Sequence, residues 1–159
     1  MYTKPGWDDY FLIIARSVSL RGTCLRRRYG AVVVKDTIIV STGYCGAASK
    51  LEDCLQKGTC VRQQLGVPSG ERYDLCKSVH AEENALQRSG LLSRGAKLYI
   101  AGENYDGTLA DGKPCRRCAR SILNAGIADV VIRLSDGGIK LYTLDELRDL
   151  ADSVESVKK

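Results

Sequence analysis

The chain has 159 residues, 44% of them hydrophobic, which suits one compact domain with its own apolar core over residues 1–159. It has no apolar run near the roughly 20 residues of a membrane helix, and its first residues lack the layout of a signal peptide, so we predict a cytoplasmic protein without a membrane partner. The net charge of +5 is partly concentrated in Arg21 and residues 26–28, which suits an anionic partner such as a phosphate but is also typical of a solvated basic face.

The first half of the chain opens with a helical pattern and continues with a hairpin. Residues 7–20 carry apolar side chains at helical spacing, which predicts an amphipathic helix packed on something larger. Residues 31–34 and 37–41 are β-branched runs separated by two residues, which predicts a hairpin whose turn is residues 35–36. Residues 43–76 show little periodicity and contain four cysteines, so we expect a long loop held by something such as a metal.

The second half alternates helices and strands. We predict a helix over residues 79–87, a strand over 96–101 and a polar loop over 102–113. A helix over 114–125, closed by Gly126, a strand over 129–134 and a last helix over 144–153 follow. A strand–helix–strand crossover normally joins two parallel strands and places the helix on one face of the sheet. The sequence therefore predicts an α/β protein of two or three layers.

The chemistry is carried by one histidine, one glutamate and two cysteines. His80, Cys115 and Cys118 supply one imidazole and two thiolates, which are three zinc ligands, and a catalytic zinc site leaves its fourth tetrahedral position open for water. Glu82 follows His80 by two positions, where we expect it beside the open position as a general base and acid. The pattern predicts a catalytic zinc site.

The cysteine spacing has a physical reason. Cys115 and Cys118 lie three positions apart, on one face of a helix whose first residue would be Pro114. At a helix start, free backbone amides and the positive end of the helix dipole favour the thiolates that zinc binds. The same reasoning places His80 in the opening turn of the preceding helix, facing Cys115.

Each of these fragments, taken alone, also occurs in proteins without this chemistry. A lone histidine is usually structural, and a Cys-x-x-Cys pair is found as a redox pair, as half of a zinc ribbon or as two buried thiols. Here His80 is the only histidine, Glu82 follows it, and Pro114 directly precedes the cysteine pair. Together these features match the His-x-Glu and Pro-Cys-x-x-Cys signature of zinc-dependent base deaminases.

The chain resembles the deoxycytidylate deaminase branch of the cytidine deaminase superfamily from about residue 7 to about residue 131. Besides the zinc motifs, the segments that carry the resemblance are residues 24–34, 41–46, 68–72 and 76–85. The resemblance implies an α/β, cytidine-deaminase-like layered fold with a central mixed five-stranded sheet flanked by helices. It also implies a homo-oligomer, a dimer or a hexamer.

The activity that the resemblance implies is the zinc-dependent hydrolysis of dCMP to dUMP and ammonia. Glu82 would protonate N3 and then the departing amine, and the backbone amide of Ala81 would bind the base carbonyl. Asn84 would orient the nucleotide, and Arg26 would bind its phosphate. The family's Gly-Tyr-Asn-Gly segment, which contacts the sugar or base, corresponds here to a segment that contains Tyr44 and Cys45.

Two departures from the family pattern keep a second substrate class open. Cys45 stands where the family has asparagine, and a thiol replaces poorly an amide that both donates and accepts. Residues 133–138 lack the tyrosines that close the pocket in relatives. Because a lost hydrogen bond in a polar site changes specificity strongly, the alternative is a deaminase of another amino-bearing base or nucleoside.

Two further alternatives concern other classes of partner. An editor of tRNA or single-stranded nucleic acid would need more basic surface, since the chain has no long basic tail. A non-catalytic, zinc-stabilised binding module would have no use for Glu82. We therefore expect a small-molecule nucleotide as the partner and no nucleic acid.

The remaining cysteines allow two interpretations. Relatives often carry a second, structural zinc, and four thiolates would complete a closed tetrahedral site. Buried reduced thiols account for irregular separations equally well. The candidate ligands of this second site are Cys24, Cys54, Cys60 and Cys76.

Overall fold

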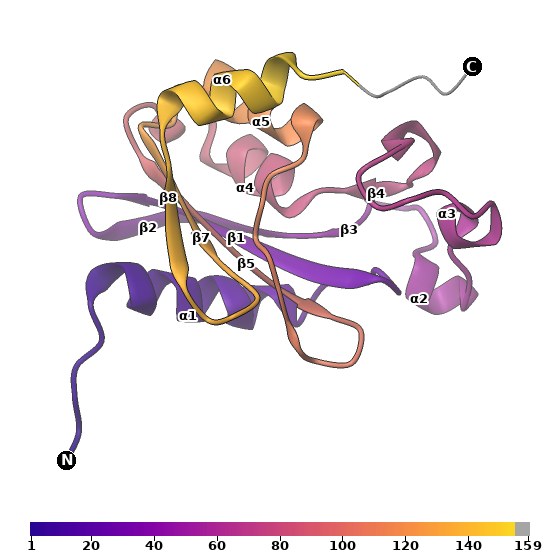
Figure 1. The fold of residues 1–159 in the computed structure, drawn as a ribbon, viewed down its shortest axis with the longest axis horizontal. Helices are drawn as coiled ribbons and strands as arrows, with labels where there is room; N and C mark the ends of the chain where they lie inside the picture. Colours follow the sequence, from indigo (N-terminus) through magenta and orange to yellow (C-terminus); the bar gives the residue numbers. More distant parts are fainter. Residues whose placement is uncertain (155–159) are drawn as a thin grey trace.

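The computed structural model describes residues 1–154 and places a mixed sheet at their centre (Figure 1). The strand order is β2-β1-β5-β7-β8, and a short strand β6 pairs with the outer part of β5. Only β5 and β7 run parallel, joined by the predicted helical crossover. The strands are β1 (Arg27–Lys35), β2 (Ile38–Tyr44), β5 (Lys97–Asn104), β6 (Leu109–Ala110), β7 (Asp129–Arg133) and β8 (Ile139–Tyr142). The five-stranded mixed sheet expected from the resemblance is confirmed, with β6 as an addition.

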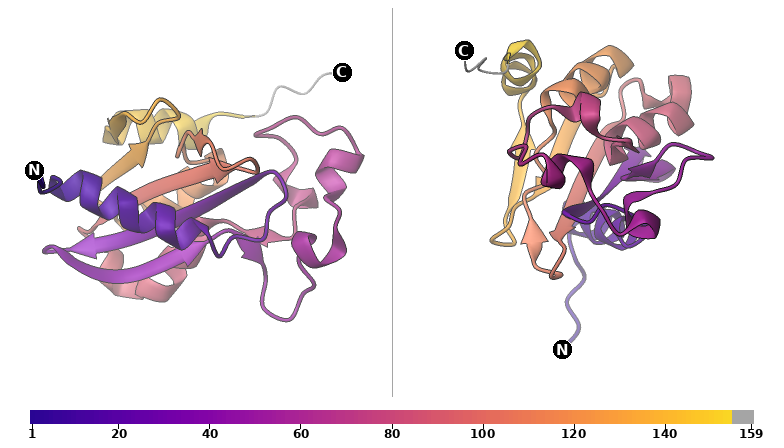
Figure 2. Two further views of the ribbon diagram at one scale, coloured as in Figure 1. Left: turned by 90° about the horizontal axis from the view of Figure 1, so that it is seen from below. Right: turned by 90° about the vertical axis from the view of Figure 1, so that its right-hand side faces the viewer.

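Helices cover both faces of the sheet, as the figures show from three sides (Figures 1 and 2). Helix α1 (Trp7–Ser19) packs on one face, while α4 (Ala81–Ser89), α5 (Arg116–Ala125) and α6 (Leu144–Asp152) lie on the other. Residues 31–34 of β1 form an unbroken apolar run, because their side chains alternate between two separate cores, one on each side of the sheet. Within residues 1–154, no helix is both long enough and apolar enough to cross a membrane.

A turn, a helix start and one unpredicted strand differ from the prediction for local reasons. The β1–β2 turn consists of Asp36 and Thr37, one residue later than predicted, and both have positive φ angles, 50° and 63°, as a two-residue hairpin turn of this class requires. Helix α5 begins at Arg116, with Cys115 as its N-cap, so Pro114 precedes the helix instead of opening it. Strand β8 was not predicted, because its four residues are short and mostly exposed at the sheet edge.

The stretch predicted as a long loop is an excursion closed at its base (Figures 1 and 2). Strands β3 (Gly46–Ala47) and β4 (Ser78–Val79) pair antiparallel, so the chain leaves and returns at one place. Between them lie α2 (Cys54–Lys57), α3 (Val61–Gln64) and a 3₁₀ turn, η1 (Tyr73–Leu75). A second 3₁₀ turn, η2 (Gly90–Ser93), follows α4. We call residues 48–77 the excursion.

Gly43 fixes the contact between β2 and α4, and this contact yields a first prediction. A Cβ atom at position 43 would overlap the backbone of Ala81 and Ala85, which cannot move aside as a flexible side chain can. We expect Gly43→Ala to lower the free energy of unfolding by about 1–3 kcal/mol, the usual cost of overpacking. Urea denaturation measures the change. Gly6→Ala is the control, because a Cβ atom there meets nothing within 4 Å; an equal loss in both variants would contradict the packing argument.

Candidate active site

Two helix starts bring the predicted metal ligands together. His80 is the N-cap of α4, and Cys115 is the N-cap of α5, where its Sγ accepts a hydrogen bond from the Cys118 N–H at 3.4 Å. Cys118 lies in the first turn of α5 and is fully buried. Among residues 1–154, these three form the one group of three or more ligand-type side chains whose ligand atoms all lie within 4.8 Å of one another.

The spacing of the ligand atoms fits zinc. The Nδ1 atom of His80 lies 3.5 Å from Cys115 Sγ and 3.3 Å from Cys118 Sγ. Tetrahedral zinc with ordinary Zn–N and Zn–S bonds separates a nitrogen and a sulfur ligand by about 3.5 Å. One imidazole and two thiols in this arrangement are therefore suited to hold a zinc ion without rearrangement.

The two thiols differ in acidity because they share a hydrogen bond. The hydrogen bond from Cys118 lowers the pKa of Cys115, and His80 lowers it further, whereas the same bond to Cys115 and burial raise the pKa of Cys118. Cys115 is therefore the more acidic of the two thiols. A bound dication would release the thiol protons, which is how cysteine sites couple metal binding to pH.

Glu82 lies in the first turn of α4 with only 6% of its surface exposed. Burial raises the pKa of its carboxyl group, the charge of His80 lowers it, and the net shift is upward. A carboxyl group whose pKa is raised from its ordinary range holds and releases a proton closer to neutral pH, which suits a general acid and base.

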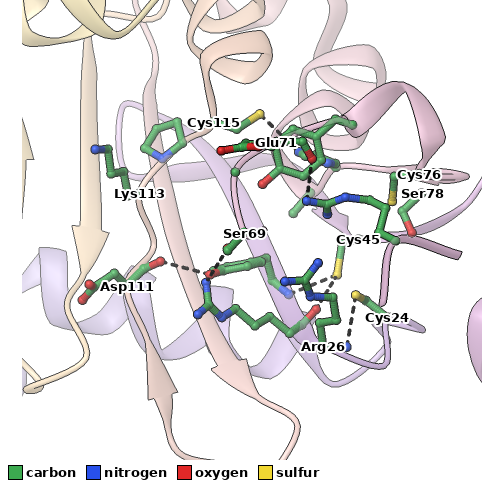
Figure 3. Close-up of a pocket in the computed structure, with 18 of the residues that line it drawn as sticks. Cys24, Arg26, Cys45, Ser69, Glu71, Cys76, Ser78, Asp111, Lys113 and Cys115 are labelled. Carbon is green, nitrogen blue, oxygen red and sulfur yellow. Dashed lines mark hydrogen bonds between the residues drawn. The ribbon is translucent and has the colours of Figure 1, made fainter. Parts of the chain in front are cut away.

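A cleft of about 990 Å³ opens beside these residues (Figure 3). In Figure 3, Cys115 lies toward one end of the cleft and Cys24 and Arg26 toward the other, with Lys113 and Asp111 along one side. His80 and Glu82 also line the cleft, whose volume is large enough for a nucleotide.

Arginines hold the wall of the cleft opposite the sheet, at residues 67–71 of the excursion. Arg26 donates to the carbonyl of Val67 at 3.3 Å, and Arg27 donates to Ser69 Oγ at 3.3 Å. Arg62, only 6% exposed, donates to the carbonyls of residues 68 and 71 at 3.0 and 2.6 Å. The partners of these arginines are neutral carbonyls and a hydroxyl, while Glu71 adds a carboxylate to the same wall.

An aromatic ring connects this wall to the metal group. Arg62 stacks on Tyr73 with its guanidinium carbon 4.4 Å from the ring centre. Tyr73 in turn meets the His80 ring edge to face, with 4.7 Å between centroids. Sequence reasoning missed both residues, because their roles depend on contacts across the excursion that no local pattern indicates.

Of the residues predicted to contact substrate, three line the cleft and two do not. Ala81, Arg26 and Cys45 line it. Asn84 does not line it, since its Nδ2 donates to the carbonyl of Tyr44 at 2.7 Å, and Tyr44 also lies outside the cleft lining. The structure thus gives Asn84 the role of joining α4 to the end of β2, where Cys45 follows.

In residues 1–154, no three of the four cysteines predicted as a second zinc site bring their sulfur atoms within 4.8 Å of one another. Burial raises the pKa of Cys54, and the other three thiols lie near enough for their charges to raise it further. Their sulfur atoms nevertheless do not come within shared ligand distance. All seven cysteines are free thiols, which agrees with the alternative of reduced thiols. The members of this group are Cys24, Cys54, Cys60 and Cys76.

Comparison with known proteins identifies close likenesses along most of the chain. The deoxycytidylate deaminase of Mycobacterium phage D29 is 39% identical over 137 residues, which are 81% of this chain and 95% of the phage protein. The deoxycytidylate deaminase of Saccharomyces cerevisiae is 33% identical over 145 residues, 90% of this chain and 40% of the yeast protein. The chain thus spans about two fifths of the length of that yeast relative.

Solved structures share the fold. The dCMP deaminase of cyanophage S-TIM5, in apo form, superposes with a TM-score of 0.60 at 26% identity and covers 94% of this chain and 95% of its own. The same enzyme in complex with dCMP and dUMP gives 0.59 at 26% identity, over 97% of this chain and 98% of its own. The model of the zinc-binding region of cytidine and deoxycytidylate deaminases matches residues 5–134. The chain therefore belongs to the cytidine and deoxycytidylate deaminase family.

Proposed function

We propose that this protein hydrolyses dCMP to dUMP and ammonia. The observation that carries the proposal is the buried carboxyl group of Glu82 next to three ligand atoms spaced for zinc, at the end of a nucleotide-sized cleft. The relatives from phage D29 and yeast are named deoxycytidylate deaminases, and the S-TIM5 enzyme was solved with dCMP and dUMP. These names support the same substrate here.

In this proposal His80, Cys115 and Cys118 would hold zinc, which would lower the pKa of a water molecule and so supply a nucleophile near neutral pH. Glu82 takes up the two protons of water in turn and delivers one to N3 and the other to the departing amino group, so that water and dCMP yield dUMP and ammonia. The N–H of Ala81 opens α4 and has no partner within the helix, so it can donate to the base carbonyl.

The phosphate end of the nucleotide is assigned to the arginine wall. Arg26 lines the cleft at the end away from the metal group, and its present partner is a neutral carbonyl at 3.3 Å. A phosphate oxygen is a stronger acceptor for a guanidinium than a carbonyl oxygen is, because the hydrogen bond joins two charges. We infer that Arg26 binds the 5′-phosphate and that the positive charge of Arg27, beside it, adds to the electrostatic attraction of the phosphate.

Cys45 supports a second candidate, deamination of another amino-bearing base or nucleoside. Burial raises the pKa of its thiol to about 12, so it stays neutral. Its sulfur accepts from the Tyr29 N–H at 3.2 Å and donates to the carbonyl of Arg27 at 3.6 Å. The thiol is thus hydrogen-bonded within the protein and offers a substrate fewer hydrogen bonds than an amide would. Tyr29, Tyr73 and Tyr105 line the cleft.

Ammonia release from the zinc-loaded protein tests these candidates. We expect dCMP to be deaminated in preference to deoxycytidine, cytidine monophosphate and a panel of other aminated bases. No ammonia release from dCMP, together with release from another compound, would overturn the proposed substrate and favour the second candidate. Silence with every compound, in protein that retains zinc, would favour a binding module.

Three further proposals concern the whole protein. We propose that residues 1–159 act as a single domain, that the protein is cytoplasmic, and that it assembles as a homo-oligomer. The domain proposal is supported by the shared sheet that β1 and β7 enter from distant parts of the chain. Light scattering of the purified protein measures the oligomer.

A further inference from the structure

We propose that Glu83 and Arg117 form a bridge that sets the position of the two metal-bearing helix starts relative to each other and so tunes the affinity of the site for zinc. This inference rests on the proposed zinc site. It concerns two residues that stand immediately beside the motifs, one after Glu82 and one between the two cysteine ligands.

The bridge connects the backbone of one ligand residue to the helix that carries the other two. Glu83 Oε2 accepts a hydrogen bond from the backbone N–H of His80 at 3.3 Å. The same oxygen accepts from Arg117 Nη2 at 2.9 Å. Arg117 Nε lies 2.9 Å from Glu83 Oε1 as an ion pair, without the alignment of a second hydrogen bond. One carboxylate therefore holds both helix starts.

Neither residue lines the cleft, so neither is placed to touch substrate. The Glu83 side chain is 17% exposed and that of Arg117 is 42% exposed, at the outer side of the metal group. Arginine stays charged in proteins, so Glu83 is paired with a permanent cation at position 117.

The Arg117–Glu83 hydrogen bond joins the first turns of α4 and α5 through side chains that are not metal ligands. Contacts of the His80 ring with the two cysteine sulfurs, and of Glu82 with Cys118, join the same two turns at the site itself. Ala85 and Ile122, farther along the two helices, share one apolar core that holds the helix bodies together. Outer partners that orient metal ligands typically change metal affinity by about 10–100-fold when they are removed.

A half-exposed ion pair contributes little to folding, whereas ligand spacing acts directly on metal affinity. This difference separates the proposed role from a merely structural one. Removing the bridge should weaken zinc binding strongly and change the melting temperature of the metal-free protein only slightly.

The test is the zinc dissociation constant of the protein, measured by competition with a chromophoric chelator. We expect Arg117→Met, which keeps the hydrocarbon stem, to weaken zinc binding by about 10-fold or more. Arg117→Lys should restore part of the affinity, because it keeps the charge but loses the two-pronged contact. Arg148→Met is the matched control, since Arg148 makes an exposed ion pair with Asp145 on α6 and should leave the constant unchanged.

A double-mutant cycle shows whether the two residues act as one unit. We expect Glu83→Gln combined with Arg117→Met to weaken zinc binding no more than Arg117→Met alone. Zinc binding within twofold of the parent in Arg117→Met, or independent and additive effects of the two changes, would overturn the bridge. The assay needs no substrate: a parent protein that binds zinc but releases no ammonia contradicts the proposed function and leaves the bridge standing.

Discussion

Replacing Glu82 by glutamine is expected to lower ammonia release from dCMP by about 10³-fold while zinc stays bound. Glutamine has nearly the shape of glutamate but cannot accept a proton from water or return one to the leaving amine. Because Glu82 lies beside the metal group without belonging to its three ligands, the change should not alter zinc content. Steady-state ammonia assays and zinc analysis of the same sample measure the two quantities.

Glu52→Gln is the control for this experiment. Glu52 lies in the excursion outside the large cleft and makes an exposed ion pair with Lys57 at 3.5 Å. The Glu52→Gln substitution removes one negative charge, as Glu82→Gln does, at a position away from the reacting groups. Full activity in Glu82→Gln would show that another group moves the protons, and loss of zinc in that variant would show that Glu82 supports the metal instead.

Replacing Cys118 by serine is expected to remove both zinc and activity. Cys118 is fully buried, and its sulfur lies 3.3 Å from the His80 ring nitrogen. A serine hydroxyl is a poor zinc ligand and is smaller than the thiol, so the site loses one of three protein ligands. Zinc affinity should fall by more than the roughly 10–100-fold that accompanies loss of an outer partner. Chelator competition and thermal melting with and without zinc measure the effect.

Cys54→Ser is the matched control and also tests the four-cysteine group. Since those sulfur atoms do not gather at ligand distance, we expect one zinc per chain in both the parent protein and this variant. Two zinc ions in the parent and one in Cys54→Ser would mean that the four thiols close around a metal after all. Unchanged zinc in Cys118→Ser would contradict the assignment of the catalytic site.

The metal group was predictable from sequence because its geometry is set locally. His80 and Cys115 each precede a helix, and Cys118 follows one turn later, so two short motifs place all three ligands once the helices pack. The crossover between β5 and β7 was predictable for the same reason, since it follows from the order of strand, helix and strand. The start of α5 was misplaced because a cysteine can cap a helix as well as lie inside it, as the Cys118 N–H to Cys115 bond shows.

The wall that the excursion contributes to the cleft was harder to predict, because distant segments build it. Arg62 and Tyr73 lie in a stretch without periodicity, and their roles emerge only from the contact of Arg62 with Tyr73 and of Tyr73 with His80. Asn84 was assigned to the nucleotide by resemblance, but its amide is already bonded to Tyr44. A sequence pattern shows which polar side chains are available, but it does not show which of them form hydrogen bonds within the protein and are therefore not free to bind substrate.

The pairing of Gly46 with Val79 gives the protein a modular wall. Because the chain departs from the body of the domain and rejoins it at adjacent positions, residues 48–77 resemble a cassette inserted at a single point. A cassette of different length with the same two ends would leave the sheet, the metal ligands and Glu82 in place, while it replaced Ser69, Tyr73 and the other side chains of that wall. Exchange of this segment is thus a route by which the same chemistry acquires a new substrate.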